Sequence, residues 1–172
     1  ALWINQCEET WHGDTELSNW IKNISNQQIF LDHDKIASLN LDLTLVQNRI
    51  VNHIINYPGV DKAYTATTMA TTQFNNGIEV LLQNGFNQKR SGDVLFVLDP
   101  AVIQYSHTGS THGSPLNYDT HVPLLFYGNG ILNGSTNDYT TIPDIAPTIS
   151  ALLGITFTNG ATGKPLSYLL VD

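Results

Sequence analysis

The chain is poor in cysteine and in basic residues, and it contains no long apolar run. Its single cysteine, Cys7, leaves no partner for a disulfide within the 172 residues. Seven lysines and arginines against 15 aspartates and glutamates give a formal net charge of −8. Nucleic acids and anionic membrane surfaces are bound through clustered Lys and Arg side chains, so this charge argues against both as partners. No apolar stretch approaches the ~20 residues of a membrane-spanning helix, and no membrane partner is expected.

What the chain does contain is typical of a globular protein. Hydrophobic residues make up 41% and charged residues 13% of the sequence. A chain of 172 residues is long enough to bury one hydrophobic core and too short for two ordinary domains.

The first half alternates between strand and helix patterns. The clearest helix pattern begins at Asp42, a good N-cap residue, and carries apolar side chains at helical spacing until Pro58-Gly59 ends it. A second, shorter helix follows a segment rich in β-formers. The predicted elements are strands at Gln28–Leu31 and Asp61–Thr68 and helices at Asp42–Tyr57 and Gly77–Asn84.

The second half continues this alternation. Val94 to Leu98 is an unbroken apolar run, which predicts a strand buried on both faces, as in a parallel sheet covered by helices. Val122 to Tyr127 is predicted as another apolar strand. A helix is expected from Ile145 to Leu153, with Asp144 at its N-cap. Alternating strands and helices of these lengths indicate an α/β fold.

His112 is the strongest candidate for a chemical role. It lies in the run Thr111-His112-Gly113-Ser114-Pro115, where small residues allow the backbone to turn tightly behind a metal ion that prefers imidazole. By composition alone, a histidine in such a loop is more often a solvated side chain. A second run, Tyr118-Asp119-Thr120-His121-Val122-Pro123-Leu124, follows directly.

These two runs resemble the C-terminal metal-binding stretch of the alkaline phosphatase superfamily, and most closely that of the bacterial periplasmic alkaline phosphatases and nucleotide pyrophosphatase/phosphodiesterases. Three further stretches are similar to the same family, namely Arg90–Asp93, Asp144–Thr148 and Gly163–Leu166. The resemblance implies the C-terminal part of an alkaline phosphatase-like α/β/α sandwich. Residues 89–172 would form this part of the phosphatase core, and residues 1–88 a small β/α insertion-like subdomain.

The resemblance also implies a function. Members of the family hydrolyse phosphate mono- or diesters with two zinc ions and an upstream Thr or Ser nucleophile. His112 matches the position of the last zinc ligand. No catalytic residue is assigned in this chain, because the nucleophile and most of the ligands would lie in an N-terminal portion upstream of Ala1. The chain alone is therefore expected to be inactive and to bind zinc weakly, since zinc sites use three or four protein ligands. The family resemblance implies a periplasmic or secreted protein.

Two alternatives remain open. The chain could be a binding or accessory module that kept the fold without the chemistry. It could also be a self-contained metal hydrolase that uses His112 with His107, Asp119 and His121. For His121 itself we favour an ordinary histidine that pairs with a carbonyl group or with Asp119.

Other polar residues are given structural roles. The Asp32-His33 pair is interpreted as a solvated strand end, since Asp34 replaces the glycine of the family's Asp-His-Gly element. Thr111 and Ser114 are interpreted as groups that shape the loop. We also expect the strands at Val94–Leu98 and Val122–Tyr127 to lie beside an exposed apolar surface and to promote self-association.

Overall fold

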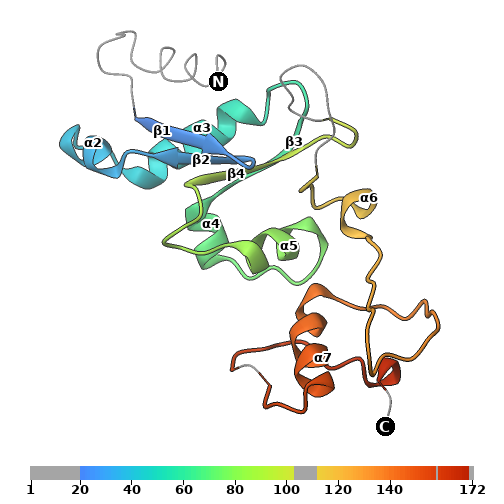
Figure 1. Cartoon of the computed structure of the whole chain (residues 1–172). Helices are drawn as coiled ribbons and strands as arrows, with labels where there is room; N and C mark the ends of the chain where they lie inside the picture. Colours follow the sequence, from blue (N-terminus) through green and yellow to red (C-terminus); the bar gives the residue numbers. More distant parts are fainter. Residues whose placement is uncertain (1–19, 103–111, 158, 171–172) are drawn as a thin grey trace. The chain divides into compact units, whose positions relative to one another are not determined.

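The computed structural model describes residues 20–102, 112–157 and 159–170 (Figure 1). The chain divides into two compact units, residues 1–122 and residues 123–172. The elements of unit 1 are, in chain order, β1 (Ile21–Ser25), β2 (Gln28–Leu31), α2 (His33–Ser38), α3 (Leu43–Ile54), β3 (Val60–Thr65), α4 (Ala66–Thr71), α5 (Gly77–Gly85), β4 (Val94–Leu98) and α6 (Asn117–Thr120). No helix in the described ranges is long and apolar enough to cross a membrane.

The four strands of unit 1 form a sheet in the order β1-β2-β4-β3. The last strand in sequence, β4, is inserted between β2 and β3 and pairs with both of them. Its central place explains the apolar run, because residues 94 to 97 are all buried. The expected parallel sheet is wrong, since all three strand pairs are antiparallel. An apolar run reports burial on both faces of a strand and carries no information about the direction of its neighbours.

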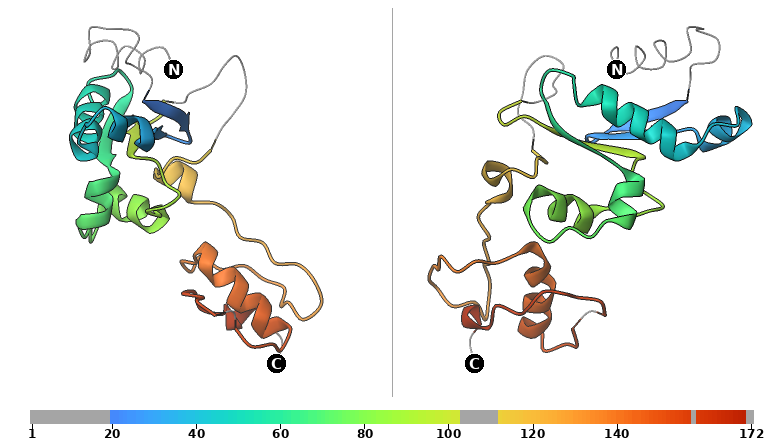
Figure 2. Two further views of the ribbon diagram at one scale, coloured as in Figure 1. Left: turned by 90° about the vertical axis from the view of Figure 1, so that its left-hand side faces the viewer. Right: turned by 180° about the vertical axis from the view of Figure 1, so that it is seen from behind.

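Helix α3 covers one face of this sheet (Figure 2). Its apolar residues Val46, Ile50 and Ile54 recur at helical spacing and are buried against the sheet. Side chains from β2, β3 and β4, together with Trp20 and Ile36, complete the core of unit 1. The helix predicted from Asp42 to Tyr57 is confirmed, although it ends at Ile54.

Helix starts in unit 1 are set by short polar side chains. The Asp42 carboxylate accepts a hydrogen bond from the Leu45 N–H at 2.9 Å, which confirms Asp42 as an N-cap. Thr65 accepts from the Thr68 N–H in the same way, so β3 ends there and α4 begins inside the stretch predicted as strand. Asp32 caps α2 by accepting from the Lys35 N–H. The Asp32-His33 pair is therefore a helix start, which corrects its interpretation as a solvated strand end.

Unit 2 is built around α7 (Ile145–Leu152), which follows the short 3-10 helix η1 (Ile142–Asp144). A second 3-10 helix, η2 (Ser167–Leu169), lies near an isolated antiparallel bridge between Ile131 and Leu170. The helix predicted from Ile145 to Leu153 is confirmed. Asp144 occupies the predicted N-cap position, but its side chain makes no capping bond to α7.

The stretch from Val122 to Tyr127 is not a strand, contrary to prediction. Val122, Leu125 and Tyr127 are exposed, Tyr127 completely. A strand requires a hydrogen-bonded neighbour, and none of the described segments pairs with this one. β4, by contrast, is buried inside its sheet. Of the two strands expected beside an exposed apolar surface, only the segment 122–127 is itself exposed, and self-association stays a prediction.

Candidate functional site

His112 lies in unit 1, in the irregular segment that leads into the short helix α6. Its side chain is exposed. The next residue, Gly113, has a φ of +109°, a backbone conformation that residues with a Cβ rarely adopt. The small-residue pattern around His112 thus corresponds to a real turn that presents the imidazole at the surface of unit 1.

The turn after His112 is fixed by Asp119. The Asp119 Oδ2 atom accepts a hydrogen bond from the Ser114 N–H at 2.7 Å. Asp119 belongs to α6, whose N-cap residue is Leu116. The hydrogen bond therefore ties this helix back to the loop that precedes it, within the eight residues from His112 to Asp119. Ser114 shapes the loop through its backbone, which agrees with its structural interpretation.

The same hydrogen bond sets the charge next to His112. The Ser114 N–H, with smaller contributions from the Ser114 side chain, the Gly113 N–H and the charge of His112, holds the pKa of Asp119 below its usual range. Asp119 is therefore a carboxylate at neutral pH. A negative charge beside the imidazole favours a bound cation there and disfavours an anion.

Among the residues that the structure describes, the other histidines form no second cluster. His121 is exposed and follows α6, where its backbone N–H donates to the Asn117 carbonyl at 3.1 Å. In the parts of the chain that the structure describes, no three His, Cys, Asp or Glu residues lie close enough to hold a metal ion. The fourth member of the proposed self-contained site, His107, lies outside the described residues, as does Thr111.

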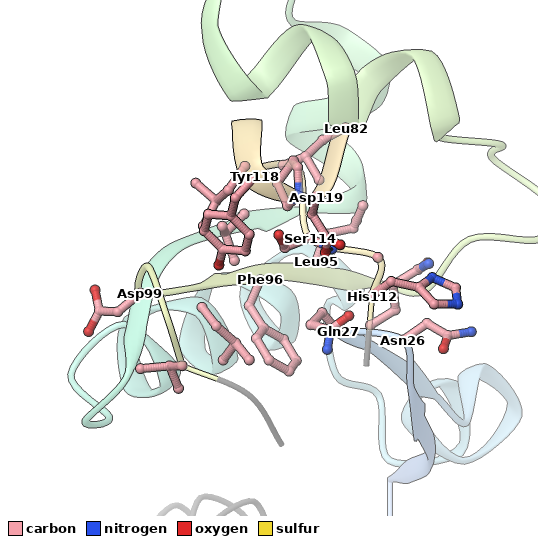
Figure 3. Close-up of a pocket in the computed structure, with 17 residues that line it drawn as sticks. Asn26, Gln27, Leu82, Leu95, Phe96, Asp99, His112, Ser114, Tyr118 and Asp119 are labelled. Atoms are coloured by element: carbon pink, nitrogen blue, oxygen red, sulfur yellow. Dashed lines mark hydrogen bonds between the residues drawn. The ribbon is translucent and has the colours of Figure 1, made fainter. Parts of the chain in front are cut away.

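A cavity of about 150 Å³ borders His112, and no pattern in the sequence predicts it. Its walls are β4, the segment from His112 to Asp119, the turn between β1 and β2, and Leu82 of α5 (Figure 3). The lining residues come from four stretches that are distant in sequence, and pattern analysis of one sequence does not bring such stretches together.

Asp93, the last residue of the Arg90–Asp93 stretch, is the centre of a buried hydrogen-bond network that the sequence did not indicate. It is buried at the start of β4, and its carboxylate accepts hydrogen bonds from the Leu31 N–H and the Gln47 amide. His33 Nε2 lies 2.7 Å from the same carboxylate. In the sequence Asp93 directly precedes an apolar strand, but its partners lie 46 to 62 residues earlier.

Two of the matching motifs meet in unit 2. The Asp144 carboxylate accepts from the Lys164 N–H at 2.8 Å, and the Thr148 hydroxyl accepts from the Leu166 N–H at 2.9 Å. Asp144–Thr148 and Gly163–Leu166 are therefore joined directly. These contacts hold residues 163–166 against the start of α7. Their role is structural, and they bring no candidate catalytic side chain into position.

Comparison with known proteins identifies relatives of this chain. No family model matches it. The chain is 35% identical over 153 residues to alkaline phosphatase PafA of Elizabethkingia meningoseptica, which covers 88% of this chain and 28% of that protein. It is 34% identical over 147 residues to alkaline phosphatase PhoV of Synechococcus elongatus, which covers 86% of this chain and 27% of the relative.

Solved structures agree with the sequence comparison. The crystal structure of wild-type alkaline phosphatase PafA matches with a TM-score of 0.86 and 32% identity, over 98% of this chain and 32% of that one. The chain thus spans about three tenths of the length of the relatives that it matches. The expected fold, part of an alkaline phosphatase-like α/β fold, is confirmed. This chain is a homologue of one part of the alkaline phosphatases PafA and PhoV in sequence, and of PafA in fold as well.

Proposed function

We propose that this chain is the C-terminal part of a zinc-dependent hydrolase of phosphate mono- or diesters, and that His112 is the last ligand of its metal centre. The observation that carries the proposal is the 35% identity to alkaline phosphatase PafA over 88% of the chain. Because the chain covers 28% of that relative, the activity would belong to a longer protein.

The residues around His112 fit one metal ligand and no more. His112 is an exposed imidazole on a turn held by Asp119, and zinc binds imidazole readily. Zinc sites use at least three protein ligands, and the described residues offer no such group. The remaining ligands and the nucleophile would come from an N-terminal portion. When two zinc ions are bound, they would supply Lewis acidity toward the phosphoryl oxygens.

The other properties of the whole protein follow from this assignment. Its substrate would be a phosphate ester, and it would act in the periplasm or outside the cell, as the alkaline phosphatase resemblance implies. The net charge of −8 disfavours nucleic acid as the substrate. The division into a subdomain of residues 1–88 and a core part of residues 89–172 stays a prediction about that longer protein.

Zinc titration of the purified chain tests the role of His112 directly. We would follow the imidazole resonances by NMR while zinc is added to the wild-type chain, to His112→Ala and to the control His121→Ala. We expect a weak interaction that shifts His112 first, disappears in His112→Ala and persists in His121→Ala. Shifts confined to His33 or His53 would contradict the assignment.

Hydrolysis assays test the function. With zinc present, we expect no turnover of an aryl phosphate monoester or diester by the chain alone. A longer protein that includes the N-terminal portion should hydrolyse one of them, and His112→Ala should abolish this activity. Turnover by the chain alone that is lost in His112→Ala would mean that these 172 residues hold a complete site. No turnover by the longer protein would favour an accessory module.

A further inference from the structure

The cavity beside His112 has an apolar floor and polar residues at several places around it. The floor is formed by β4 and the walls by α5 and the segment before α6, with Leu82, Leu95, Val97, Pro115 and Leu116 among the lining residues. Asn26 and Gln27, in the turn between β1 and β2, line it together with His112. Figure 3 shows Asn26 and His112 on one side of the cavity and Leu82 with Tyr118 on the other. A bound ligand would therefore contact apolar side chains at the floor and polar side chains near Asn26, Gln27 and His112.

The floor of the cavity consists of four consecutive residues of β4, Leu95 to Leu98. Side chains alternate along a strand, so both faces of β4 contribute to the lining. Phe96 also belongs to the core of unit 1, whereas Leu95 and Val97 face the cavity from the other side of the strand. All four side chains are apolar, so the floor is apolar.

The size of the cavity fits one aromatic ring. Its volume is about 150 Å³. An apolar cavity of about 150 Å³ in another protein is large enough to bind benzene. Phe96 and Tyr118 are among the lining residues, and aromatic side chains pack favourably against a further ring.

The charges around the cavity exclude an anion from its interior. Asp99 and Asp119 both line it, and the Asp119 carboxylate accepts a hydrogen bond from the Ser114 N–H at 2.7 Å. A phosphate group inside the cavity would lie close to these carboxylates in a partly desolvated space, where like charges repel strongly. The part of a phosphate ester that fits the cavity is its neutral organic group.

We propose that this cavity binds the aromatic group of an aryl phosphate, with the phosphate outside it on the side of His112. The role in substrate choice rests on the proposed function, whereas the binding of a neutral aromatic ring does not. The cavity lies wholly within unit 1, so the chain as it stands should bind phenol without any metal.

The test is a titration of the ¹⁵N-labelled chain with phenol in the presence of EDTA, followed by NMR. We expect saturable shifts of the Leu95, Leu116 and Tyr118 amides. Cyclohexanol, which has a similar size and no aromatic face, and benzoate, which is anionic, should each bind at least threefold more weakly. The absence of saturable shifts with phenol would overturn the proposal, as would equal binding of benzoate.

Two neighbouring leucines of α5 provide a matched pair of variants. Leu82 lines the cavity, whereas Leu81 is half exposed and does not line it. Leu82→Trp should fill the cavity and raise the Kd for phenol at least tenfold, and Leu81→Trp should change it less than twofold. If Leu82→Trp loses its circular dichroism spectrum, Val102→Trp fills the cavity from its exposed side instead. An unchanged Kd in a folded filling variant would contradict the proposal.

The experiments distinguish a failure of the cavity proposal from a failure of the proposed function. Phenol binding requires neither zinc nor His112 as a ligand. A chain that binds phenol but shows no zinc shift at His112 would keep the cavity assignment and lose the metal assignment. The opposite result would keep His112 as a ligand and remove the cavity as an aryl site.

Discussion

His33 Nε2 lies 2.7 Å from Oδ1 of Asp93, a residue 60 positions later in the chain. The same carboxylate accepts from the Leu31 N–H at 2.8 Å and from the Gln47 amide at 3.1 Å. One buried side chain at the start of β4 thus joins β2, α2 and α3. Such a carboxylate is stabilising only while all of its partners are in place, because each buried donor left without an acceptor is costly.

We expect Asp93→Ala to lower the free energy of unfolding of unit 1 by about 2–6 kcal/mol. The substitution would leave the Leu31 N–H and the Gln47 amide without their acceptor, at about 1–3 kcal/mol for each buried group. Urea denaturation followed by circular dichroism measures this loss. Asp61→Ala is the control, since Asp61 is exposed on β3, and it should change the stability by less than about 0.5 kcal/mol. Equal midpoints for the two variants would show that the buried network contributes nothing.

The Tyr64 hydroxyl donates to Glu79 Oε1 at 2.5 Å and ties β3 to α5. Burial and this bond to a carboxylate raise the pKa of Tyr64 above its ordinary range. The folded state therefore favours the neutral phenol. This contribution to stability is complete below the pKa of an unfolded tyrosine, near 10, and is lost as pH rises through the higher folded value.

We expect Glu79→Gln to lower the pKa of Tyr64, because the charge that opposes ionisation is removed. NMR of ¹³Cζ-labelled tyrosine as a function of pH measures the ionisation. Asp34→Asn, a change on α2, serves as the control and should leave the Tyr64 titration in place. A Tyr64 titration that is unchanged in Glu79→Gln would mean that the contact with Glu79 does not control its ionisation.

Acid should weaken unit 2 through Asp144. Hydrogen bonds from the Lys164 N–H, the Thr141 N–H and the Thr141 hydroxyl hold the pKa of Asp144 below its usual range. Since the folded pKa is lower than the unfolded one, the carboxylate stabilises unit 2 fully above about pH 4. This stabilisation is lost as pH falls through the folded value.

The measurement is amide hydrogen exchange at Lys164 and Thr141 over a series of acidic pH values. After correction for intrinsic exchange rates, protection should fall in acid in the wild-type chain. Asp144→Asn should reduce that pH dependence, whereas Asp138→Asn, at an exposed position of the same unit, should preserve it. Protection that falls equally in all three proteins would assign the acid sensitivity to another group.

Gly163 tolerates no side chain. A Cβ at this position would lie 2.1 Å from the Pro143 carbonyl oxygen and 2.6 Å from the Asp144 nitrogen, both of them backbone atoms. Gly163→Ala should therefore destabilise unit 2 by about 1–3 kcal/mol or more, because the backbone must move apart. The control is Gly134→Ala in the same unit, where a Cβ meets no atom within 4 Å. Thermal unfolding of both variants measures the difference, and equal melting temperatures would contradict this close approach.

Local signals made the helices and the buried strand predictable from the sequence. Asp42 with its helical apolar spacing predicted α3 and its cap, and the run from Val94 to Leu98 predicted the strand at the centre of the sheet. The direction of that strand and the state of Val122–Tyr127 were not predictable, because both depend on the neighbour that a strand pairs with. Hydrophobic pattern specifies which side chains prefer burial and leaves the choice of partner open.

The site was predictable only where one motif contains it. His112 and the small residues after it form a turn, and Asp119 closes that turn from within the adjacent motif. The cavity and the Asp93 network were missed because each joins stretches that lie far apart in the sequence. Asp144 occupies the predicted N-cap position of α7, but its carboxylate accepts a hydrogen bond from the Lys164 N–H, 20 residues later, which no local pattern indicated.

The position of β4 between β2 and β3 has a consequence for synthesis of the chain on the ribosome. β2 and β3 are made first, and neither can gain its shared neighbour until residues 94–98 have emerged. Until then both strands have unpaired backbone groups and apolar side chains, the features that chaperones bind and that drive aggregation. Translation that slows or stalls between Thr65 and Val94 should therefore carry the greatest risk of aggregation for unit 1.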